Sequence, residues 1–540
     1  MMKVNWQNFK LEDFARQSFW ALLSGVLVGT TYIPFPPWAL LFCWTPLWWD
    51  ILRKPISLRL AFQKAWLAQF VLSLIGFHWI SFVSHEFGNL PWPIAGLVLL
   101  LFASLVHLYF PLTVVFALWC QRRLKLPTWG VAILIPLFTA LGEIGWPALF
   151  PWNLGYTLLW AGSPIAQWAD VIGFQGLSAG LLLINGVLTI MALHRRPIVW
   201  WPLGAGLLTI LACLTWGGLD RQKPWQNSQG AQTQILRVLP VQANIGNFEK
   251  FMALNGQNFR KMIVDQYLNL TRQSLATQGP VDLILWPESA LPLYMDRMDL
   301  GETLAQQIGQ FVTAVKVPLL TGAFSHQLVP QKGQLANWDY NALFLFDENM
   351  QLLGSPYRKT QLLAFGEYIP GEEVFPILSN LNLNGGGFHR GEGPTTLKFR
   401  ETSLGPMICY ESLDPQFSRR LSLLGAEVLI NITNDSWFGP ISEPPQHLFM
   451  TLARALEVRR PLIRVTNTGI TTAILADGTL LAQSPVGSPW SNRLDIDYRP
   501  SPPQTFYAQY GQYLAAGLVF ISLLWIALVK TVAAQNRELP

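Results

Sequence analysis

The stretch Ser-Leu-Gly-Pro-Met-Ile-Cys-Tyr-Glu-Ser at residues 403–412 is an apolar run that ends on a cysteine and then turns polar. Its length and apolar character predict a buried strand over residues 403–409. Similar runs alternate with helical segments through residues 234–481. This alternation predicts an α/β layered domain, in which reactive groups gather just past the carboxyl ends of strands. Cys409 and Glu288 both stand at such strand ends.

The α/β block extends from Asp220 to about Pro503 and is flanked by apolar sequence. Only 13% of the chain is charged and 51% is apolar, whereas soluble proteins are usually roughly 25% charged. A membrane-spanning helix needs about 20 mostly apolar residues. Eight such segments are predicted: two within 17–49, separated by Pro34, Pro36 and Pro37, and then 65–84, 93–120, 128–142, 171–193, 198–216 and 512–529. The predicted fold is therefore a multi-span α-helical membrane domain with seven helices at residues 1–219, an α/β domain at 220–503, and an eighth helix with a tail at 504–540.

Basic residues in the short loops predict the orientation in the membrane. With eight spans, every loop or tail that contains Lys or Arg falls on the same side of the membrane. These residues are Lys3, Lys10, Arg16, Arg53, Lys54, Arg59, Lys64, Arg122, Arg123, Lys125, Arg195, Arg196, Lys530 and Arg537. The other short loops, such as 86–92 and 146–168, hold no Lys or Arg. Because positive charge favours the cytoplasmic side, we expect both termini in the cytoplasm and the α/β domain in the periplasm or its equivalent.

Composition argues against several classes of function. The net charge of +5 does not come from a Lys/Arg-rich tract with interleaved aromatic residues, so no nucleic-acid partner is expected. Of the four cysteines, Cys409 alone is in the α/β block. Because there is no CxxC pair or His/Cys cluster, no metal site and no cofactor are expected. The glycines at 385–387 lack a following helix and a Lys-Ser/Thr pair, which predicts a flexible loop and no phosphate-binding loop.

Glu288, Lys359 and Cys409 supply the groups that a cysteine-based acyl-transfer site needs. A cysteine attacks as a thiolate, although its unperturbed pKa is about 8.5. A poorly solvated carboxylate such as Glu288 can take the proton of the thiol. Lys359 and the backbone N–H of Tyr410 could donate to the oxyanion of a tetrahedral intermediate. An ammonium between two carboxylates would also keep all three groups charged.

Each of these signals also has a structural interpretation. A buried cysteine after a strand is most often a packing residue, and a lysine in a loop is usually solvated. Asn434-Asp435 is expected to shape a turn, with lining of the site as the alternative. His447 is expected to pack at the start of a helix rather than to carry protons. The Trp-rich loop at 146–168 is expected to form an interfacial aromatic belt, with the wall of a lipid cleft as the alternative.

Four motifs are similar to those of the carbon–nitrogen hydrolase, or nitrilase, superfamily. They are Leu-Trp-Pro-Glu-Ser-Ala at 285–290, Tyr-Arg-Lys-Thr-Gln-Leu-Leu-Ala-Phe-Gly-Glu-Tyr-Ile-Pro at 357–370, Ile-Cys-Tyr-Glu-Ser at 408–412 and Asn-Ile-Thr-Asn-Asp-Ser-Trp-Phe-Gly at 431–439. They resemble most closely the membrane-embedded branch of that superfamily, the apolipoprotein N-acyltransferases. The plan of eight spans, with the domain between the seventh and the eighth, is also similar, so the resemblance covers nearly the whole chain.

The resemblance implies an αββα sandwich and a Glu–Lys–Cys triad formed by Glu288, Lys359 and Cys409. It also implies supporting roles in the active site for Glu367, Tyr410 and Glu411. The lipid cleft that we expect beside them would be lined by Phe251, Gly386, Gly387, Trp437 and Phe438. Members of the family often carry a tryptophan shortly after the Asn-Ile of the first strand, where this chain has Phe248 and Phe251. A phenyl ring can still pack on an acyl chain, but it has no indole N–H to donate.

The implied reaction is a ping-pong acyl transfer. Cys409 would take an acyl chain from a phospholipid as a thioester and pass it to the α-amino group of an S-diacylglyceryl cysteine at the N-terminus of a lipoprotein. The protein would be a monomer in the bacterial inner membrane, with a phospholipid donor and a lipoprotein acceptor as partners. One alternative is a membrane-anchored amidase or nitrilase, although a single anchor would then suffice. Another is a scaffold or lipid-binding module, which would not need the three triad residues.

Overall fold

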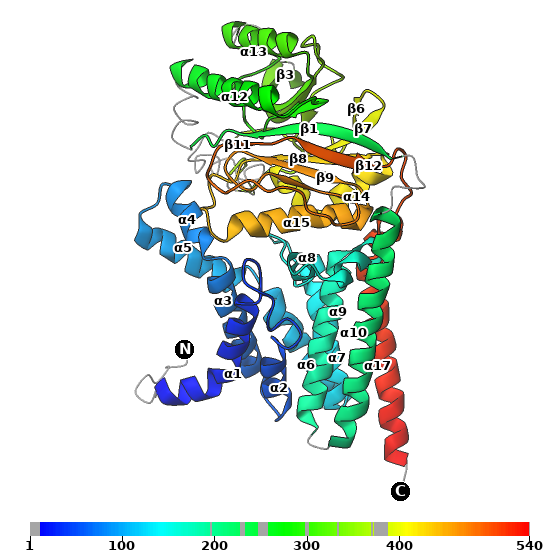
Figure 1. Cartoon of the computed structure of the whole chain (residues 1–540). Helices are drawn as coiled ribbons and strands as arrows, with labels where there is room; N and C mark the ends of the chain where they lie inside the picture. The colour runs from blue at the N-terminus through cyan, green and yellow to red at the C-terminus, as the bar shows by residue number, and fades with distance from the viewer. Residues whose placement is uncertain are drawn as a thin grey trace.

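In the computed structural model, an α/β domain sits on one end of a bundle of helices (Figure 1). The structure describes residues 11–538 apart from 149, 195–196, 227–232, 247–256, 297–301, 332–333, 365, 369–370 and 372–386. The bundle comes from both ends of the chain, because α1 to α10 precede the α/β domain and α17, Leu514–Glu538, follows it. α17 leads from the α/β domain to the C-terminus at the opposite end of the bundle (Figure 1).

Among the described residues, six helical segments are long and apolar enough to cross a membrane. They are Leu58–Gly76 (α3), Trp92–Leu124 (α5, Trp92–Leu105, with α6, Tyr109–Leu124), Thr128–Gly145 (α7), Pro164–Leu193 (η2, Pro164–Trp168, with α9, Ala169–Leu193), Trp200–Gln226 (in α10, Pro197–Gln226) and Phe506–Gln535 (α16, Phe506–Tyr510, with α17). The apolar side chains of α10 and α17 are mostly exposed, so both helices lie at the rim of the bundle, where lipid would cover them.

The two helices that the structure contains within residues 17–49 are shorter than the predicted spans. The apolar part of α1 (Leu11–Gly29) is Gln17–Gly29, and α2, Thr45–Leu52, has 8 residues. At about 1.5 Å per residue, both are too short for a hydrocarbon core of about 30 Å. Turns occupy the residues between them, where Pro34, Pro36 and Pro37 lack the N–H that a helix needs. These two helices are not among the candidate spans of the described residues, and the count of eight spans stays a prediction.

Two mixed β-sheets form the centre of the α/β domain. The first has the order β11-β1-β2-β3-β4-β5, with β12 also paired to β1, and the second has the order β10-β9-β8-β7-β6. The strands of the first sheet are β1 (Gln234–Gln242), β2 (Leu283–Leu285), β3 (Leu319–Gln331), β4 (Gln334–Phe346), β5 (Tyr357–Arg358), β11 (Trp490–Ser491) and β12 (Leu494–Tyr498). Those of the second are β6 (Leu397–Phe399), β7 (Thr402–Ile408), β8 (Val428–Thr433), β9 (Leu462–Thr466) and β10 (Thr472–Ile474). β1 to β3 are parallel, as are β7 to β9, so their carboxyl ends meet at one edge of each sheet.

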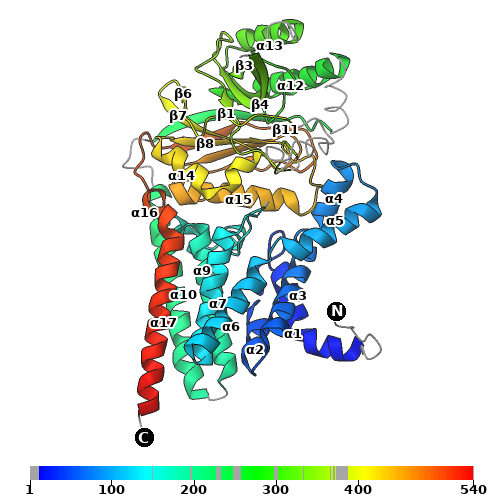
Figure 2. The same ribbon diagram turned by 180° about the vertical axis from the view of Figure 1, so that it is seen from behind.

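Helices cover the outer face of each sheet (Figures 1 and 2). α12, Gln257–Thr277, and α13, Glu302–Val315, lie on the first sheet. α14, Pro415–Leu423, and α15, Glu443–Val458, lie on the second. The layers are therefore helix, sheet, sheet, helix, which confirms the predicted αββα sandwich and, with the helical bundle, the predicted fold class.

Alternate residues of a strand face different cores. In β2, Leu283 and Leu285 belong to the core between the sheets, whereas Ile284 belongs to the core beneath α12 and α13. Because both faces of these strands are buried, their sequence is a continuous apolar run rather than an alternation. This explains why the strand that ends before Cys409 was recognisable in the sequence.

α15 separates the second sheet from the membrane helices (Figure 1). It is buried along almost its whole length, because the sheet covers one side and the bundle covers the other. Polar groups at its first turn are paired across this junction. Gln446 Nε2 donates to Ile33 O at 2.7 Å and to Gly76 O at 2.8 Å. Trp79 Nε1 donates to Gln446 Oε1 at 3.1 Å.

Buried charges hold the other end of α15 against α9. The positive φ of Gly173 interrupts α9, and the N–H of the next residue, Phe174, donates to Glu457 Oε1 at 3.1 Å. Arg459, directly after α15, lies 2.9 Å from Asp170 and donates to the side chain of Gln167 at 2.7 Å. Removing one partner of a buried ion pair leaves an uncompensated charge, so this junction depends on each member being present.

We expect Arg459→Leu to lower the free energy of unfolding by about 3–5 kcal/mol, because it leaves the buried Asp170 with Arg221 as its remaining cationic partner. Melting temperatures of the purified protein in detergent would measure the loss. Arg400→Leu is the control, because Arg400 is exposed and lies 3.3 Å from Asp282, a surface contact worth at most about 1 kcal/mol. Equal shifts of the melting temperature in the two variants would show that the buried ion pair between Arg459 and Asp170 does not stabilise the junction.

Candidate active site

Glu288 lies just past the carboxyl end of β2, and its side chain is 6% exposed. Its loop crosses β3 closely at Gly322. A Cβ at that position would lie 2.6 Å from Pro287 O and 2.8 Å from Glu288 Cα. Only glycine lets the loop approach the sheet this closely, so Gly322 fixes where the Glu288 carboxylate is placed.

One ammonium group joins two carboxylates in the site. Lys359, directly after β5, is 1% exposed, and its Nζ lies 3.2 Å from Glu288 Oε1 and 2.9 Å from Glu367 Oε1. Asn341 Nδ2 donates to the same two oxygens at 2.7 Å and 3.0 Å. Leu363 N donates to Glu367 Oε2 at 2.8 Å. Each carboxylate is thus held by at least two donors.

The two carboxylates keep Lys359 protonated. Burial by itself would lower the pKa of Lys359, but the charges of Glu288 and then Glu367 outweigh burial and hold this pKa well above its usual range. The ammonium therefore remains positive at physiological pH and provides a fixed positive charge beside Cys409.

Cys409 follows β7 directly and begins a short 3-10 helix, Cys409–Leu413. Its φ of 51° lies in the left-handed region, which non-glycine residues rarely adopt and which is concentrated at functional sites. The side chain is 7% exposed. The parallel register pairs Ile408 of β7 with Ile432 of β8, so the backbone brings Cys409 and Thr433 together at the carboxyl ends of the two strands.

The thiol of Cys409 is protonated at rest. Burial raises the pKa of Cys409 well above its ordinary value, and the charge of Glu288 raises it further. Lys359 and Thr433 act in the opposite direction but do not outweigh them. Such a thiol needs a nearby base before it can attack, and Glu288 is the carboxylate that acts on it most strongly.

Glu411 ties the cysteine loop to the lysine loop. Its buried carboxylate accepts hydrogen bonds of 2.6 to 2.8 Å from Tyr357 Oη, the N and Oγ1 of Thr360, and Ile408 N. Burial raises the pKa of Glu411, while these donors act against the rise. Tyr410 extends in another direction, and its Oη donates to Ala148 O of the membrane domain at 3.3 Å. Both supporting residues therefore lie beside Cys409.

The aromatic residues expected in the lipid cleft contact the membrane domain. Trp437 packs edge-on against Phe87 with 4.6 Å between ring centroids. Phe438 packs in the same way against Trp79 at 5.6 Å. Their partners belong to or directly follow α4, Trp79–Glu86. The loop after β8 thus lies on the membrane domain.

Of the three other predicted cleft residues, the structure describes one. Phe251 and Gly386 lie outside the described residues. Gly387 is described and has a φ of 151°, which favours glycine. Within the Trp-rich loop at 146–168, Trp152 is buried inside the bundle against Tyr32, with 5.1 Å between ring centroids.

Asp435 and His447, expected as turn and packing residues, belong to a buried cluster of ion pairs. Arg464 Nη2 lies 2.6 Å from Asp435 Oδ2, and His447 Nδ1 lies 3.1 Å from Asp435 Oδ1 and 3.2 Å from Glu443 Oε1. Asp435, Glu443 and His447 are also donor types that bind metal ions. However, His447 Nδ1 faces two carboxylates, so it carries a proton, and Arg464 already holds one oxygen of Asp435. These contacts are those of a cluster that balances its own charges.

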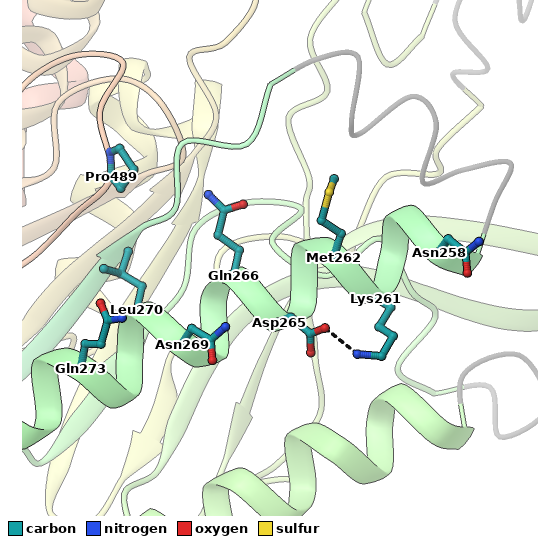
Figure 3. A pocket seen from close by; sticks show the side chains of 9 residues that line it. All are labelled: Asn258, Lys261, Met262, Asp265, Gln266, Asn269, Leu270, Gln273 and Pro489. Atoms are coloured by element: carbon teal, nitrogen blue, oxygen red, sulfur yellow. Dashed lines mark hydrogen bonds and ion pairs between the residues drawn. The ribbon is translucent and has the colours of Figure 1, made fainter.

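A hollow of about 610 Å³ lies along α12, away from these residues (Figure 3). In Figure 3 the side chains of α12 line it, Lys261 and Asp265 pair at 2.5 Å, and Pro489 lies across from them. The lining residues are Asn258, Lys261, Met262, Asp265, Gln266, Asn269, Leu270, Gln273 and Pro489. None of the triad residues is among them, so this hollow is not the site of the thiol.

Sequence reasoning missed two residues that contact the candidate site, Asn341 and Thr433. Asn341 lies within β4, and Thr433 is the last residue of β8. Both are short polar side chains within apolar strands, which is the feature of the sequence that could have pointed to them. That signal does not say what the side chain contacts, because its partners come from other strands.

Two family models match the chain: a carbon–nitrogen hydrolase model over residues 228–490, and a model of the apolipoprotein N-acyltransferase N-terminal domain over residues 24–187. An apolipoprotein N-acyltransferase of Bdellovibrio bacteriovorus is 43% identical over 519 residues, which cover 95% of this chain and 93% of that protein. One from Geobacter metallireducens is 30% identical over 531 residues, 95% and 96% of the two chains. A solved carbon–nitrogen hydrolase of Helicobacter pylori matches at 17% identity and a TM-score of 0.36, over 53% of this chain and 94% of that one.

We expect Lys359→Met to make folding stability depend on pH. In the natural protein the raised pKa of Lys359 keeps its ion pairs complete below the usual lysine range, so their contribution is constant between about pH 5 and 8. In the variant, Glu288 and Glu367 are buried together without a cation, and one of them is expected to take up a proton. The folded state then binds more protons than the unfolded state, so stability falls as the pH rises through this window.

Melting temperatures at about pH 5 and pH 8 would measure this effect. The difference between the natural protein and Lys359→Met should be larger at pH 8, by about 1.4 kcal/mol for each pH unit that the proton uptake spans. Lys398→Met is the control, because Lys398 is exposed and donates to Glu401 O. A difference that is the same at both pH values would show that the carboxylates do not depend on Lys359.

Proposed function

The chain belongs to the apolipoprotein N-acyltransferase family and is an acyltransferase, and we propose that it transfers an acyl chain from a phospholipid to the α-amino group of an S-diacylglyceryl cysteine at the N-terminus of a lipoprotein. One observation carries the proposal. Cys409 adjoins the Glu288–Lys359–Glu367 cluster, and the next residue, Tyr410, contacts the membrane domain. A thiol in this position can meet both a lipid ester and an amine that is anchored in the membrane.

In the first half-reaction, Cys409 attacks the ester carbonyl carbon of the phospholipid. Glu288 takes the proton of the thiol as the new C–S bond forms. The oxyanion of the tetrahedral intermediate is stabilised by the Lys359 ammonium and by a backbone N–H at the start of the 3-10 helix. When the C–O bond breaks, Glu288 returns the proton to the departing alkoxide. The products are a lysophospholipid and an acyl thioester on Cys409.

In the second half-reaction, the neutral α-amine of the lipoprotein attacks the thioester carbonyl. The same ammonium stabilises the second oxyanion. Glu288 accepts a proton from the attacking nitrogen, and the C–S bond breaks. The proton then passes to the sulfur, so the amide product leaves a neutral thiol. The base therefore ends each half-reaction in the state in which it began.

The position of the loop after β8 supports lateral access for the lipid. Trp437 and Phe438, which follow the end of β8, pack on α4 and the residue after it, so this loop joins the edge of the second sheet to the membrane domain. An acyl chain that follows these rings remains in apolar surroundings until its ester meets the thiol. Access from the outer leaflet therefore avoids moving the chain through water.

The distribution of charge supports a periplasmic position for the α/β domain. Lys530 lies in the second half of α17, which ends far from the α/β domain (Figure 1). Arg122 and Arg123 lie in the last turn of α6, just before the short connection to α7. Because basic loops remain on the cytoplasmic side, the opposite end of the bundle would face the periplasm together with Cys409.

Mass spectrometry of the purified protein with phospholipid tests the reaction. We expect a fatty-acyl adduct on the peptide that contains Cys409, and its transfer to an added diacylglyceryl peptide. Cys409→Ser should form no adduct, and Glu288→Gln should form it about 100-fold to 10,000-fold more slowly, the usual effect of losing a general base. An adduct that water removes as fast as the peptide amine does would instead indicate a hydrolase.

The lipid path is tested by Phe438→Asp. A carboxylate at this position would have to lose water against an acyl chain, so we expect KM for the phospholipid to rise by roughly tenfold or more. Alkylation of Cys409 by a small water-soluble reagent should change little. Phe438→Leu keeps the surface apolar and serves as the control. If Phe438→Asp abolished alkylation and left KM unchanged, the segment would belong to the catalytic centre and not to the lipid path.

A further inference from the structure

Thr433 is a polar residue that the second sheet places beside Cys409. It is the last residue of β8, and the register Ile408–Ile432 places it beside Cys409 at the carboxyl ends of two parallel strands. Asn431, two residues earlier in β8, donates to Cys409 O at 3.3 Å, which holds the two strand ends together. Thr433 is fully buried, so its hydroxyl must find its partners among protein groups.

Two groups compete for the single proton of this hydroxyl. On one side is the sulfur of Cys409. On the other is Asp435 Oδ1, at 3.4 Å from Thr433 Oγ1. A hydroxyl has one proton to donate, so it can serve one acceptor fully at a time. The choice depends on how strongly Asp435 is already satisfied by other donors.

Asp435 has two stronger donors. Arg464 Nη2 lies 2.6 Å from Asp435 Oδ2, and His447 Nδ1 lies 3.1 Å from Asp435 Oδ1. The carboxylate also fills the space beside Gly469, where a Cβ would lie 2.0 Å from Asp435 Oδ2. These contacts fix the carboxylate and balance its charge, so Asp435 gains little from a further hydrogen bond from the Thr433 hydroxyl.

The charge of His447 is set by the groups that face it, which among the described residues are Asp435, Glu443 and Arg464. Burial and Arg464 lower the pKa of His447, but the charge of Asp435, the hydrogen bond to it and the contact with Glu443 raise this pKa above its ordinary value. Burial raises the pKa of Glu443 to about 7. His447 is therefore positive at low and neutral pH, and this charge is lost as the pH rises through its raised pKa.

We propose that Thr433 is a catalytic residue that donates a hydrogen bond to the Cys409 sulfur as the thiolate forms, and that Asp435 and His447 are positioning residues that keep its hydroxyl available. The proposal rests on the proposed role of Cys409 as the nucleophile. When the thiol proton moves to Glu288, the hydroxyl turns from Asp435 to the sulfur. Arg464 and the protonated His447 then hold Asp435 without it. Loss of the His447 charge would draw the hydroxyl back to Asp435.

The pH dependence of Cys409 alkylation by iodoacetamide tests the role of Thr433. The assay uses the full chain in detergent and follows the Cys409 peptide by mass spectrometry, which separates it from Cys43, Cys120 and Cys213. Thr433→Val keeps the shape of the side chain and removes the donor. We expect it to slow alkylation at neutral pH by roughly 10-fold to 100-fold, the range for a hydrogen bond to a charged group, and to move the midpoint to higher pH.

Thr433→Ser keeps the hydroxyl and should restore alkylation to near the natural rate. If Thr433→Val reacted like the natural protein, or if Thr433→Ser were as slow as Thr433→Val, the hydrogen bond would have no role and the proposal would be overturned. The assay needs no lipid and no lipoprotein. A negative result therefore leaves the acyl-adduct experiment unaffected, and a failure of that experiment leaves the thiol–hydroxyl coupling open to measurement.

A double-mutant cycle tests the positioning residues. His447→Gln can still donate to Asp435 but carries no charge, and we expect it to slow alkylation several-fold at neutral pH. The same substitution in a Thr433→Val background should have no further effect on alkylation, because the hydroxyl through which His447 acts on the sulfur has been removed. Equal slowing in both backgrounds would show that His447 acts by another path, and would overturn this part of the proposal. Melting temperatures would confirm that each variant is folded.

Discussion

A single buried ammonium, that of Lys359, is the constraint on which the rest of the site depends. Without it, Glu288 and Glu367 would be two carboxylates side by side in a medium that does not tolerate them. With it, both carboxylates have a cationic partner within 3.2 Å, next to the neutral thiol of Cys409. The first sheet contributes to this arrangement in two ways. Gly322 lets the Glu288 loop approach β3 closely, and Asn341 donates hydrogen bonds to both carboxylates.

The two sheets contribute different parts of the candidate site. The first sheet supplies the cation and the carboxylates, and the second supplies Cys409 and Thr433 at the ends of β7 and β8. Glu411 links the two halves by accepting hydrogen bonds from both the cysteine loop and the lysine loop. The site therefore exists only when the sheets are packed face to face, and the shared apolar core between them determines its geometry.

α15 connects this chemistry to the membrane. Its first turn holds the His447 cluster next to β8 and bonds through Gln446 to the membrane helices. Its far end is fixed to α9 by Arg459 and Glu457. A soluble hydrolase could leave this layer facing water. Here the layer is buried on both sides, and the aromatic loop after β8 and Tyr410 contact the membrane domain.

The sequence by itself determined the fold class and the positions of the strand ends at which Glu288 and Cys409 stand. Continuous apolar runs predicted buried strands, and the residues after two of them, Glu288 and Cys409, could be identified because parallel strands end at a common edge. The sequence could not predict that turns around the prolines would separate two short helices within residues 17–49. Nor could it predict that Asn341, 53 residues from Glu288, would bond to it, or that His447 would be ion-paired. Tertiary structure decided these points, because the partners of a buried polar group come from distant segments and are chosen by packing, whereas local sequence encodes only periodicity and propensity.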